Sequence, residues 1–221
     1  MKYSRLFSVM AFTTLIASCE LAPFEESDTA VVQDETVVEE ESSLYTENTD
    51  SDGETFVFET NDTKYLNEAG YTIWTTKYVN ESDNFSPISV TLCKESGISE
   101  AGFGIVFCSQ EIDGRPFMLT VLINSNGLYT VGKVDNGVFS HLNGGWKGSS
   151  YINRGQGIRN EVSVSYDGVG KKFLLKINGY EITDFTVPEK IKFKDSRWGF
   201  AVVIAGNEAF PNLPVKVIFE K

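Results

Sequence analysis

The sequence has few of the side chains on which most catalytic sites depend. It contains one histidine, His141, and three cysteines in 221 residues. A zinc site needs three or four clustered histidine and cysteine ligands, and these residues are too few and too far apart to provide them. A serine hydrolase of the nucleophile-elbow type needs a G-x-S-x-G stretch, which does not occur. We therefore expect no metal site of this kind, and we expect His141, in FSHLNGG, to lie in a turn.

The N-terminal segment lacks a hydrophobic run long enough to cross a membrane. Two basic residues, Lys2 and Arg5, precede about eleven apolar residues, whereas a spanning helix needs about twenty. Small residues follow the run. This layout is typical of a secretory signal peptide and not of a membrane helix.

The end of that segment carries a more specific pattern. Its last residues, Leu15-Ile16-Ala17-Ser18-Cys19, resemble the lipobox of bacterial lipoprotein signal peptides. The resemblance implies cleavage after Ser18 and attachment of fatty acids such as palmitate to the sulfur of Cys19. The exported protein would then be anchored to the inner or the outer membrane of a bacterial cell envelope. An ordinary secretory signal with an incidental cysteine is the alternative.

Positive charge is scarce and unevenly placed. Residues 20–53 contain twelve Asp or Glu and no Lys or Arg, while residues 54–221 contain 17 Lys or Arg against 19 Asp or Glu. Nucleic-acid binding needs clustered basic residues that displace counterions from phosphates, so we expect no such partner. The acidic stretch has too few large apolar residues to fold alone. These shifts predict a signal peptide over 1–18, a lipid-anchored disordered tether over 19–53 and a folded domain over 54–221.

The folded part shows short apolar alternations and no helical pattern of three turns. The runs are rich in β-branched and aromatic residues and are separated by turn pairs such as Asn178-Gly179. Alternate residues of 161–166 and 172–177 face opposite sides, whereas 117–123 and 198–204 are apolar on both faces, as central strands are. The pattern predicts an all-β, antiparallel two-sheet sandwich or a barrel. The predicted strands are 55–59, 71–79, 88–94, 102–107, 117–124, 128–134, 161–166, 172–177, 198–205 and 215–220.

Four stretches carry a resemblance to a known superfamily. They are GFGIVFC at 102, LYTVGKVDNG at 128, GQGIRNEVSVSYDG at 155 and KKFLLKINGYEITDF at 171, the last ending in a short strand to Phe185. Together they resemble the concanavalin A-like lectin/glucanase superfamily, in the branch of laminin-G-like and 3-keto-disaccharide-hydrolase-like domains. The resemblance covers about 88–204 and implies a concanavalin A-like jelly-roll sandwich. Because the superfamily includes glycan binders, protein binders and glycosidases, the fold alone leaves the function open.

One short stretch, EIDG at 111, matches half of a glycosidase motif. Family-16 glucanases on this fold carry E-[IL]-D-x-x-E, with the two glutamates as nucleophile and acid. Here Gly-Arg-Pro stands where the second glutamate should come, and glycoside hydrolysis usually requires two carboxyl groups. We expect a hydrophilic hairpin loop joining Phe107 to Phe117, with Glu111 and Asp113 in water and no catalytic residue. No cofactor is expected, although a calcium ion would suit these acids.

Cys93 and Cys108 remain if Cys19 carries lipid. They lie in adjacent predicted strands, in a compartment that permits disulfides. A hairpin turn near Ile98 would place Cys93 opposite Phe103 and not opposite Cys108. The sequence therefore leaves two alternatives, a disulfide or two small buried thiols.

Exposed aromatic faces are the usual feature of sugar-binding sites, and four residues are candidates. Trp146 and Tyr151 lie in the Gly- and Ser-rich stretch 141–157, which we expect to be a long loop. Packing at the sandwich edge is the alternative role for Trp146. Trp74 and Tyr78 share one face of the predicted strand 71–79, which is either core or a concave binding face. Trp198 is expected in the core.

These observations favour a binding protein over an enzyme. The chain is predicted to be an envelope lipoprotein that presents a non-catalytic β-sandwich, with a glycan or an extracellular protein as ligand. Two alternatives remain: an enzyme that acts on glycosides on the same fold, and a structural or protein-interaction lipoprotein.

Overall fold

The computed structural model describes residues 45–50, 53–61, 71–187, 190–205 and 214–221. Within these ranges the chain forms strands, turns and loops, and no helix. None of the described segments is therefore a helix of the length and hydrophobicity that a membrane crossing requires. The predicted signal peptide, Cys19 and residues 20–44 of the predicted tether lie outside the described residues.

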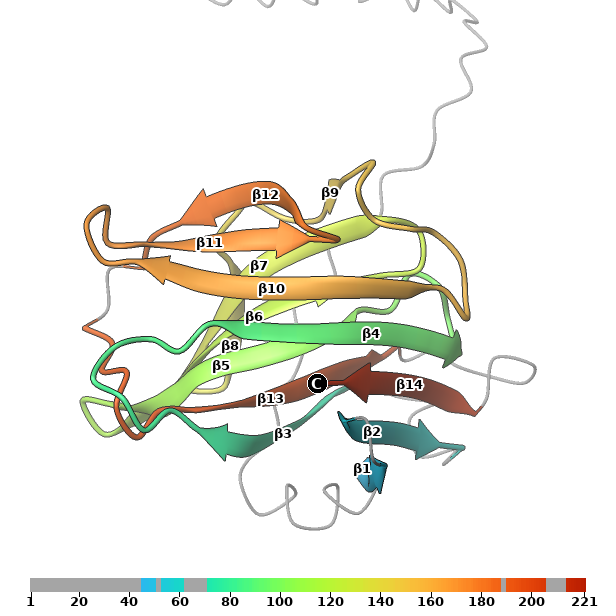
Figure 1. Ribbon diagram of the computed structural model, residues 1–221, viewed down its shortest axis with the longest axis horizontal. Coiled ribbons are helices and arrows are strands. Elements are labelled where there is room, and N and C mark those ends of the chain that lie inside the picture. The colour runs from blue at the N-terminus through green and yellow to red at the C-terminus, as the bar shows by residue number, and fades with distance from the viewer. Residues whose placement is uncertain (1–44, 51–52, 62–70, 188–189, 206–213) are drawn as a thin grey trace, which may run out of the picture.

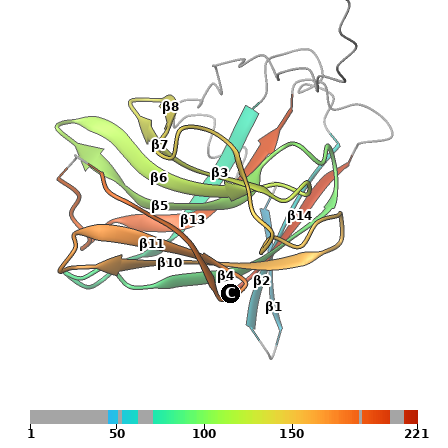
Figure 2. The ribbon, with the colours of Figure 1, turned by 90° about the horizontal axis from the view of Figure 1, so that it is seen from above.

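Fourteen strands form two antiparallel sheets that stack as layers (Figures 1 and 2). The first, called the β10 sheet, has the order β1-β2-β14-β4-β10-β11-β12; the second, called the β6 sheet, has the order β3-β13-β5-β6-β7-β8, with β9 paired to β7. The strands are β1 (Tyr45–Asp50), β2 (Gly53–Thr60), β3 (Tyr71–Val79), β4 (Ile88–Ser96), β5 (Phe103–Ile112), β6 (Arg115–Ile123), β7 (Leu128–Asp135), β8 (Val138–His141), β9 (Lys147–Gly148), β10 (Arg159–Asp167), β11 (Lys172–Ile177), β12 (Tyr180–Phe185), β13 (Arg197–Ile204) and β14 (Val215–Glu220).

The chain passes from one sheet to the other between β2, β3, β4 and β5, between β9 and β10, and again between β12, β13 and β14. As a result β14 lies between β2 and β4, and β13 lies between β3 and β5. These crossings between facing sheets are those of a jelly roll. The predicted all-β jelly-roll sandwich is confirmed.

The core fills the space between the sheets. Leu175 and Ile177 of β11 are buried there, opposite Val164 and Val162 of β10, while Glu161 faces water. The alternation predicted for 161–166 and 172–177 is thus confirmed. The strands β6 and β13 each have a neighbour on both sides, so the prediction that they are central is also confirmed.

The first strand corrects the predicted boundary of the tether. Residues 45–50, YTENTD, form β1 and pair with β2, although this stretch is polar and acidic. Tyr45 explains the pairing, because its ring packs against Phe58 with ring centroids 5.0 Å apart. Its hydroxyl also donates to the carbonyl oxygen of Ile73 in the other sheet, at 3.0 Å. The folded part therefore begins at least nine residues before Glu54.

The EIDG stretch is not the loop that we expected. The strand β5 continues through it to Ile112, and β6 begins at Arg115, so that only Asp113 and Gly114 form the turn. Both turn residues have positive φ, 53° and 75°, as a two-residue hairpin turn requires. Pro116 is tolerated because it is the second residue of β6, beside the turn, where it lies opposite Glu111.

A long loop, 142–158, crosses the end of the sandwich from the β6 sheet to the β10 sheet, as expected from its composition. It contains β9 and is fastened along its length by backbone bonds. The amide of Ser149 donates to Gly127, and that of Gly155 donates to Ser125. The loop is therefore an ordered cover over one end of the domain.

Candidate functional site

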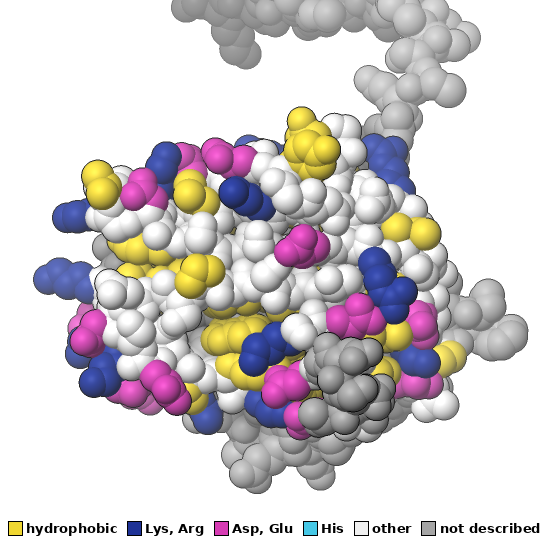
Figure 3. Space-filling model, in the orientation of Figure 1, with side chains coloured by type: hydrophobic (Ala, Val, Ile, Leu, Met, Phe, Trp, Pro, Cys, Tyr) yellow, Lys and Arg dark blue, Asp and Glu magenta, His cyan; other side chains and the backbone are white. Residues whose placement is uncertain are grey.

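The outer face of the β6 sheet, the side turned away from the core, carries an apolar cluster of its own. This is unusual for a two-layer sandwich, in which the outer face of a sheet is normally polar. The outer face of the β10 sheet follows the normal pattern: it faces the viewer in Figure 3, where polar and charged side chains cover most of the surface. The cluster on the β6 sheet comprises buried Val106, Met118, Leu122, Val134 and Ala201, with half-buried Trp74, Phe139 and Val203 packed against them.

A β-bulge decides which side chains of β3 reach this face. Trp198 pairs with Tyr78 and Phe200 pairs with Thr75, so two residues of β3 lie opposite the single Gly199. The extra residue reverses the alternation. Trp74 consequently joins the outer cluster, whereas Tyr78 turns inward.

The prediction that Trp74 and Tyr78 share a face is therefore wrong. Tyr78 stacks on Trp198 with ring centroids 4.1 Å apart and packs edge-on to Phe56. Its hydroxyl donates to Glu54 Oε2 at 2.6 Å, and this bond lowers the pKa of Glu54 below its usual value. Burial, followed by that same carboxylate, raises the pKa of Tyr78. Tyr78 is a half-buried packing residue, and the expectation that Trp198 belongs to the core is consistent with this stack.

Trp146 lies at the other side of the outer face. Its side chain is 39% exposed and its ring covers Gly102. A Cβ atom at Gly102 would lie 2.9 Å from Trp146 Cη2, so the ring needs a glycine beneath it. Leu122 also contacts this position. Trp146 thus packs at the sandwich edge and still presents part of its ring to water, which combines the two roles that the sequence left open.

Small residues lie between the large ones on this face. The register runs from Trp74 to Ala201, then to Gly104, and then to Leu122 beside Trp146. Ala201 and Gly104 therefore leave the middle of the row without a large side chain. Ala201 and Gly104 are themselves buried, so the surface that a ligand can reach is the exposed part of the rings of Trp74 and Trp146.

A polar group borders the face at β7 and β8. The Thr130 hydroxyl lies 2.7 Å from His141 Nδ1 and donates to Asn143 Oδ1 at 3.2 Å. Because the hydroxyl has one proton and gives it to Asn143, Nδ1 donates to Thr130 in this arrangement, which leaves Nε2 of a neutral imidazole as an acceptor. His141 also packs edge-on against Phe139, with ring centroids 4.9 Å apart. The expectation that His141 lies in a turn is wrong, since it ends strand β8.

Phe139 is the residue that the sequence reading missed. Its ring lies over Gly132, where a Cβ atom would come within 2.3 Å of Phe139 Cε2. The alternation of VFSH after the Asn136-Gly137 turn was the available signal, but four residues are a weak strand pattern.

Tyr151 does not lie on the outer face with Trp74 and Trp146. It stacks on Tyr180 of β12, with ring centroids 4.3 Å apart and planes inclined by 12°. The side chain of Asn178 donates to the carbonyl oxygen of Tyr151 at 2.7 Å and so fixes the loop there. Of the four predicted ligand residues, the structure brings only Trp74 and Trp146 to one face.

The strands of the β6 sheet contain two carboxylates, Glu111 and Asp135. Glu111 pairs with Pro116, whereas Asp135 pairs with the next residue, Phe117, so the two point to opposite faces. Asp135 is ion-paired with Arg115 at 3.5 Å. The described strands therefore do not supply the facing carboxyl pair of a glycosidase. Glu111 and Asp113 are exposed, as expected.

The cysteines belong to different sheets. Cys93 in β4 and Cys108 in β5 are both buried free thiols, so the thiol alternative is the one observed. Burial raises the pKa of both. Among the described residues no three His, Cys, Asp or Glu side chains lie close enough to hold a metal ion. Glu111 and Asp113 thus have no third ligand of these types for calcium.

Comparisons with solved structures bear on the fold. A family 16 endo-glucanase from Bacteroides ovatus, in complex with G4G3G-2F-DNP, superposes with a TM-score of 0.54 at 9% identity, over 81% of this chain and 85% of that one. A GH16 protein of the Bacteroides ovatus mixed linkage glucan PUL, in complex with G4G4G3G product, gives 0.52 at 10% identity, over 81% and 83%. This chain has their fold.

The carbohydrate-binding module CBM66 from Bacillus subtilis is a more distant neighbour, with a TM-score of 0.45 at 12% identity over 74% of this chain and 89% of that one. No protein-family model and no curated protein sequence matches the chain. The expected concanavalin A-like architecture is thus confirmed at the level of fold, on which the two glucanases and this chain agree.

Proposed function

We propose that this protein is a glycan-binding module of an exported envelope lipoprotein, and that it binds its ligand without cutting it. The single observation that carries the proposal is the aromatic outer face of the β6 sheet. Trp74, Phe139 and Trp146 lie there around small buried residues, and His141, held by the buried Thr130 hydroxyl, adds a polar group at the border. Aromatic faces that stack on sugar rings, with a few polar groups beside them, are the usual chemistry of glycan recognition.

The two glucanase structures support the choice of ligand class. One is an endo-glucanase in complex with G4G3G-2F-DNP, and the other is a GH16 protein of a mixed linkage glucan PUL in complex with G4G4G3G product. Binding without hydrolysis is supported by the carboxylates, because Glu111 and Asp135 point to opposite faces and Asp113 lies in a turn. A neutral glycan chain fits this surface best, since the outward row of paired residues from Trp74 through Ala201, Gly104 and Leu122 to Thr130 carries no charge.

The experiment is a glycan array followed by titration of tryptophan fluorescence with the oligosaccharides that bind. We expect Trp74→Ala and Trp146→Ala each to weaken binding by about tenfold or more, which corresponds to about 1.4 kcal/mol. Tyr180→Ala removes an exposed aromatic ring elsewhere and is the matched control. Binding by no glycan on the array would contradict the proposal. Release of reducing ends from a polysaccharide panel would show an enzyme instead.

The membrane part of the proposal rests on the lipobox-like residues 15–19, which lie outside the described residues. Lipid on Cys19 would attach the protein to a membrane of the bacterial envelope. The acidic chain between the lipid and β1 would then hold the domain away from an anionic lipid surface, by like-charge repulsion.

A further inference from the structure

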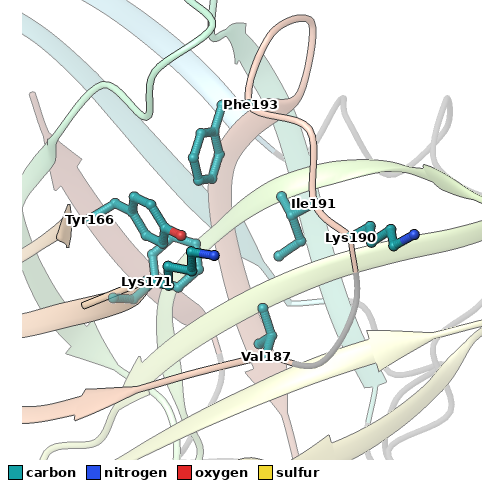
Figure 4. Close-up of a pocket in the computed structure, with 7 residues that line it drawn as sticks. Tyr166, Lys171, Val187, Lys190, Ile191 and Phe193 are labelled. Carbon is teal, nitrogen blue, oxygen red and sulfur yellow. The ribbon is translucent and has the colours of Figure 1, made fainter. Parts of the chain in front are cut away.

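A pocket of about 340 Å³ lies at the end of the sandwich where β10 runs into β11 (Figure 4). Three aromatic rings line it, from Tyr166, Phe173 and Phe193, together with the aliphatic side chains of Val187 and Ile191. Its volume is at the lower end of the range of ligand sites, which suits one or two sugar rings. It is separate from the outer face of the β6 sheet, because Tyr166 and Phe173 belong to the β10 sheet.

The wall that carries Phe193 is held in place from several sides. The side chain of Gln110 both donates to and accepts from the backbone of Lys192, each at 3.0 Å. Ser196 closes a turn onto the carbonyl oxygen of Phe193 through its amide and its hydroxyl. The Phe193 ring packs on Tyr166, with centroids 4.8 Å apart. The pocket is therefore formed before any ligand arrives, which lowers the entropic cost of binding.

Two positive charges line this pocket and are not neutralised. Two exposed lysines belong to its wall, and neither has an ion-pair partner among the described residues. In contrast Lys172, which points out of β11, is paired with Asp184. In Figure 4 Lys171 extends toward Tyr166, while the end of Lys190 points away. The two lysines are Lys171 and Lys190; Lys192 and Lys194 are exposed in the same segment as Lys190 and do not line the pocket.

Lys171 occupies a backbone position that favours glycine. Its φ is 52°, in the left-handed region, in a turn that already contains Gly168 and Gly170. A non-glycine residue is disfavoured in this conformation, so glycine would be the more stable choice. Strain of this kind indicates that the side chain has a role other than folding.

We propose that this pocket binds a carboxylate-bearing sugar, a uronic acid residue at the end of or within an acidic glycan. The rings of Tyr166 and Phe193 offer apolar faces to the pyranose ring. The carboxylate meets the ammonium group of Lys171 and the hydroxyl of Tyr166, which has no hydrogen-bond partner among the described residues. The two lysines steer the acidic chain toward the pocket. The pocket and the outer face of the β6 sheet bind different ligands. The proposal for the pocket therefore does not depend on the proposal for that face.

The test uses three tetrasaccharides: an oligogalacturonate, a sulfated galactan fragment and neutral cellotetraose. Their binding is followed by calorimetry and by amide NMR shifts at Lys171 and Phe193. We expect the oligogalacturonate alone to bind with shifts at both positions, and the affinity to fall as salt rises. Lys171→Gln should weaken it about tenfold or more, whereas Lys176→Gln, which removes the same charge from an exposed site on β11, should not.

The variant Lys171→Gly distinguishes a binding role of the lysine from a structural one. It should bind the oligogalacturonate weakly or not at all, while its melting temperature stays equal to that of the unaltered protein or rises. A lysine with only a structural role would not give this result. The proposal is overturned if the oligogalacturonate shifts neither amide, if the sulfated fragment alone does, or if Lys171→Gln and Lys176→Gln weaken binding equally. The response of Trp74 and Trp146 fluorescence to cellotetraose reports the outer face of the β6 sheet independently, so failure of either site can be recognised.

Discussion

Trp146 keeps its place on the outer face because Gly102 has no side chain. A Cβ atom added at Gly102 would lie 2.9 Å from Trp146 Cη2. This distance is shorter than the contacts that Cβ atoms make in proteins. The neighbour that must give way is the far end of the indole, so the backbone need not move. A single methyl group at this position therefore acts on the proposed ligand face and spares the core.

Gly102→Ala should tilt or lift the indole of Trp146 and weaken glycan binding by several-fold. The free energy of unfolding should change by less than about 1 kcal/mol, since no backbone clash results. Fluorescence titration and urea unfolding measure the two effects. Gly148→Ala is the matched control, because its nearest contact, Leu128 Cδ2 at 3.8 Å, is an ordinary one. Equal loss of binding in both variants would contradict the role given to Gly102.

Tyr78→Phe should reduce the pH dependence of stability. The hydrogen bond from Tyr78 lowers the pKa of Glu54 below 4.5, so its stabilising effect is present above that value and is lost as the pH falls through the lower, folded-state pKa. Tyr78 itself has a raised pKa, so its contribution is complete below about pH 10 and is lost as the pH rises beyond it. Melting temperatures across the acidic and alkaline limbs should both decline less steeply in the variant. Unchanged slopes would show that the bond does not form in solution.

At the scale of the strand, the periodicity of apolar residues was enough to predict most elements. Ten runs and the short strand ending at Phe185 all appear in the structure, because burial on one face imposes alternation on the sequence. The strands β1, β8 and β9 were missed. They are short or polar and owe their existence to a neighbouring strand, as β1 does to β2 and to the packing of Tyr45 on Phe58.

The β-bulges are the reason that the candidate site could be predicted only in part from the sequence. One in β3 sends Trp74 and Tyr78 to opposite faces, and another in β5 puts Cys108 and Ser109 opposite Met118, with Cys108 at φ 51°. A bulge depends on how two strands twist against each other, and neither strand alone encodes it. The fold and the long loop that carries Trp146 followed from the sequence, but the division of the aromatic residues between faces did not.

Trp74→Ala should therefore affect mainly glycan binding, whereas Tyr78→Ala should affect mainly the stability of the fold. Trp74→Ala should weaken glycan binding by about tenfold or more. Tyr78→Ala should leave binding nearly unchanged and lower the free energy of unfolding by about 3 kcal/mol, because its ring packs on Trp198 and Phe56 in the core. Denaturant unfolding and fluorescence titration of both variants provide the measurement. Loss of binding in a folded Tyr78→Ala protein would contradict the assignment of faces.

At the scale of the whole molecule, charge divides the chain. The acidic stretch 20–53 contains no base, the described sandwich is near neutral, and two unpaired lysines line the pocket at one end of it. Two surfaces with different chemistry result, a nearly uncharged aromatic face and a basic pocket. A protein with both could hold a polysaccharide of mixed charge at two points, which raises avidity without any new contact at either point.

Cys19→Ser should release the protein from the membrane fraction of the bacterium that makes it. Two or three acyl chains give stable attachment, whereas without the thiol none can be added. Fractionation and labelling with radioactive fatty acid measure the change, and Cys93→Ser is the control because that thiol is buried in β4. Equal labelling of the Cys19→Ser protein and the unaltered protein would contradict the lipoprotein proposal.

Strand β1 has a mechanical consequence. If lipid holds one end of the chain and a bound polysaccharide holds the domain, any tension between cell and matrix enters the fold at Tyr45. Six ladder pairs join β1 to β2, and the Tyr45 hydroxyl ties the same residue to Ile73 of the opposite sheet. The load is thus shared by both layers from the first residue that carries it, and β1 would be the first strand to peel away when the force exceeds what those bonds withstand.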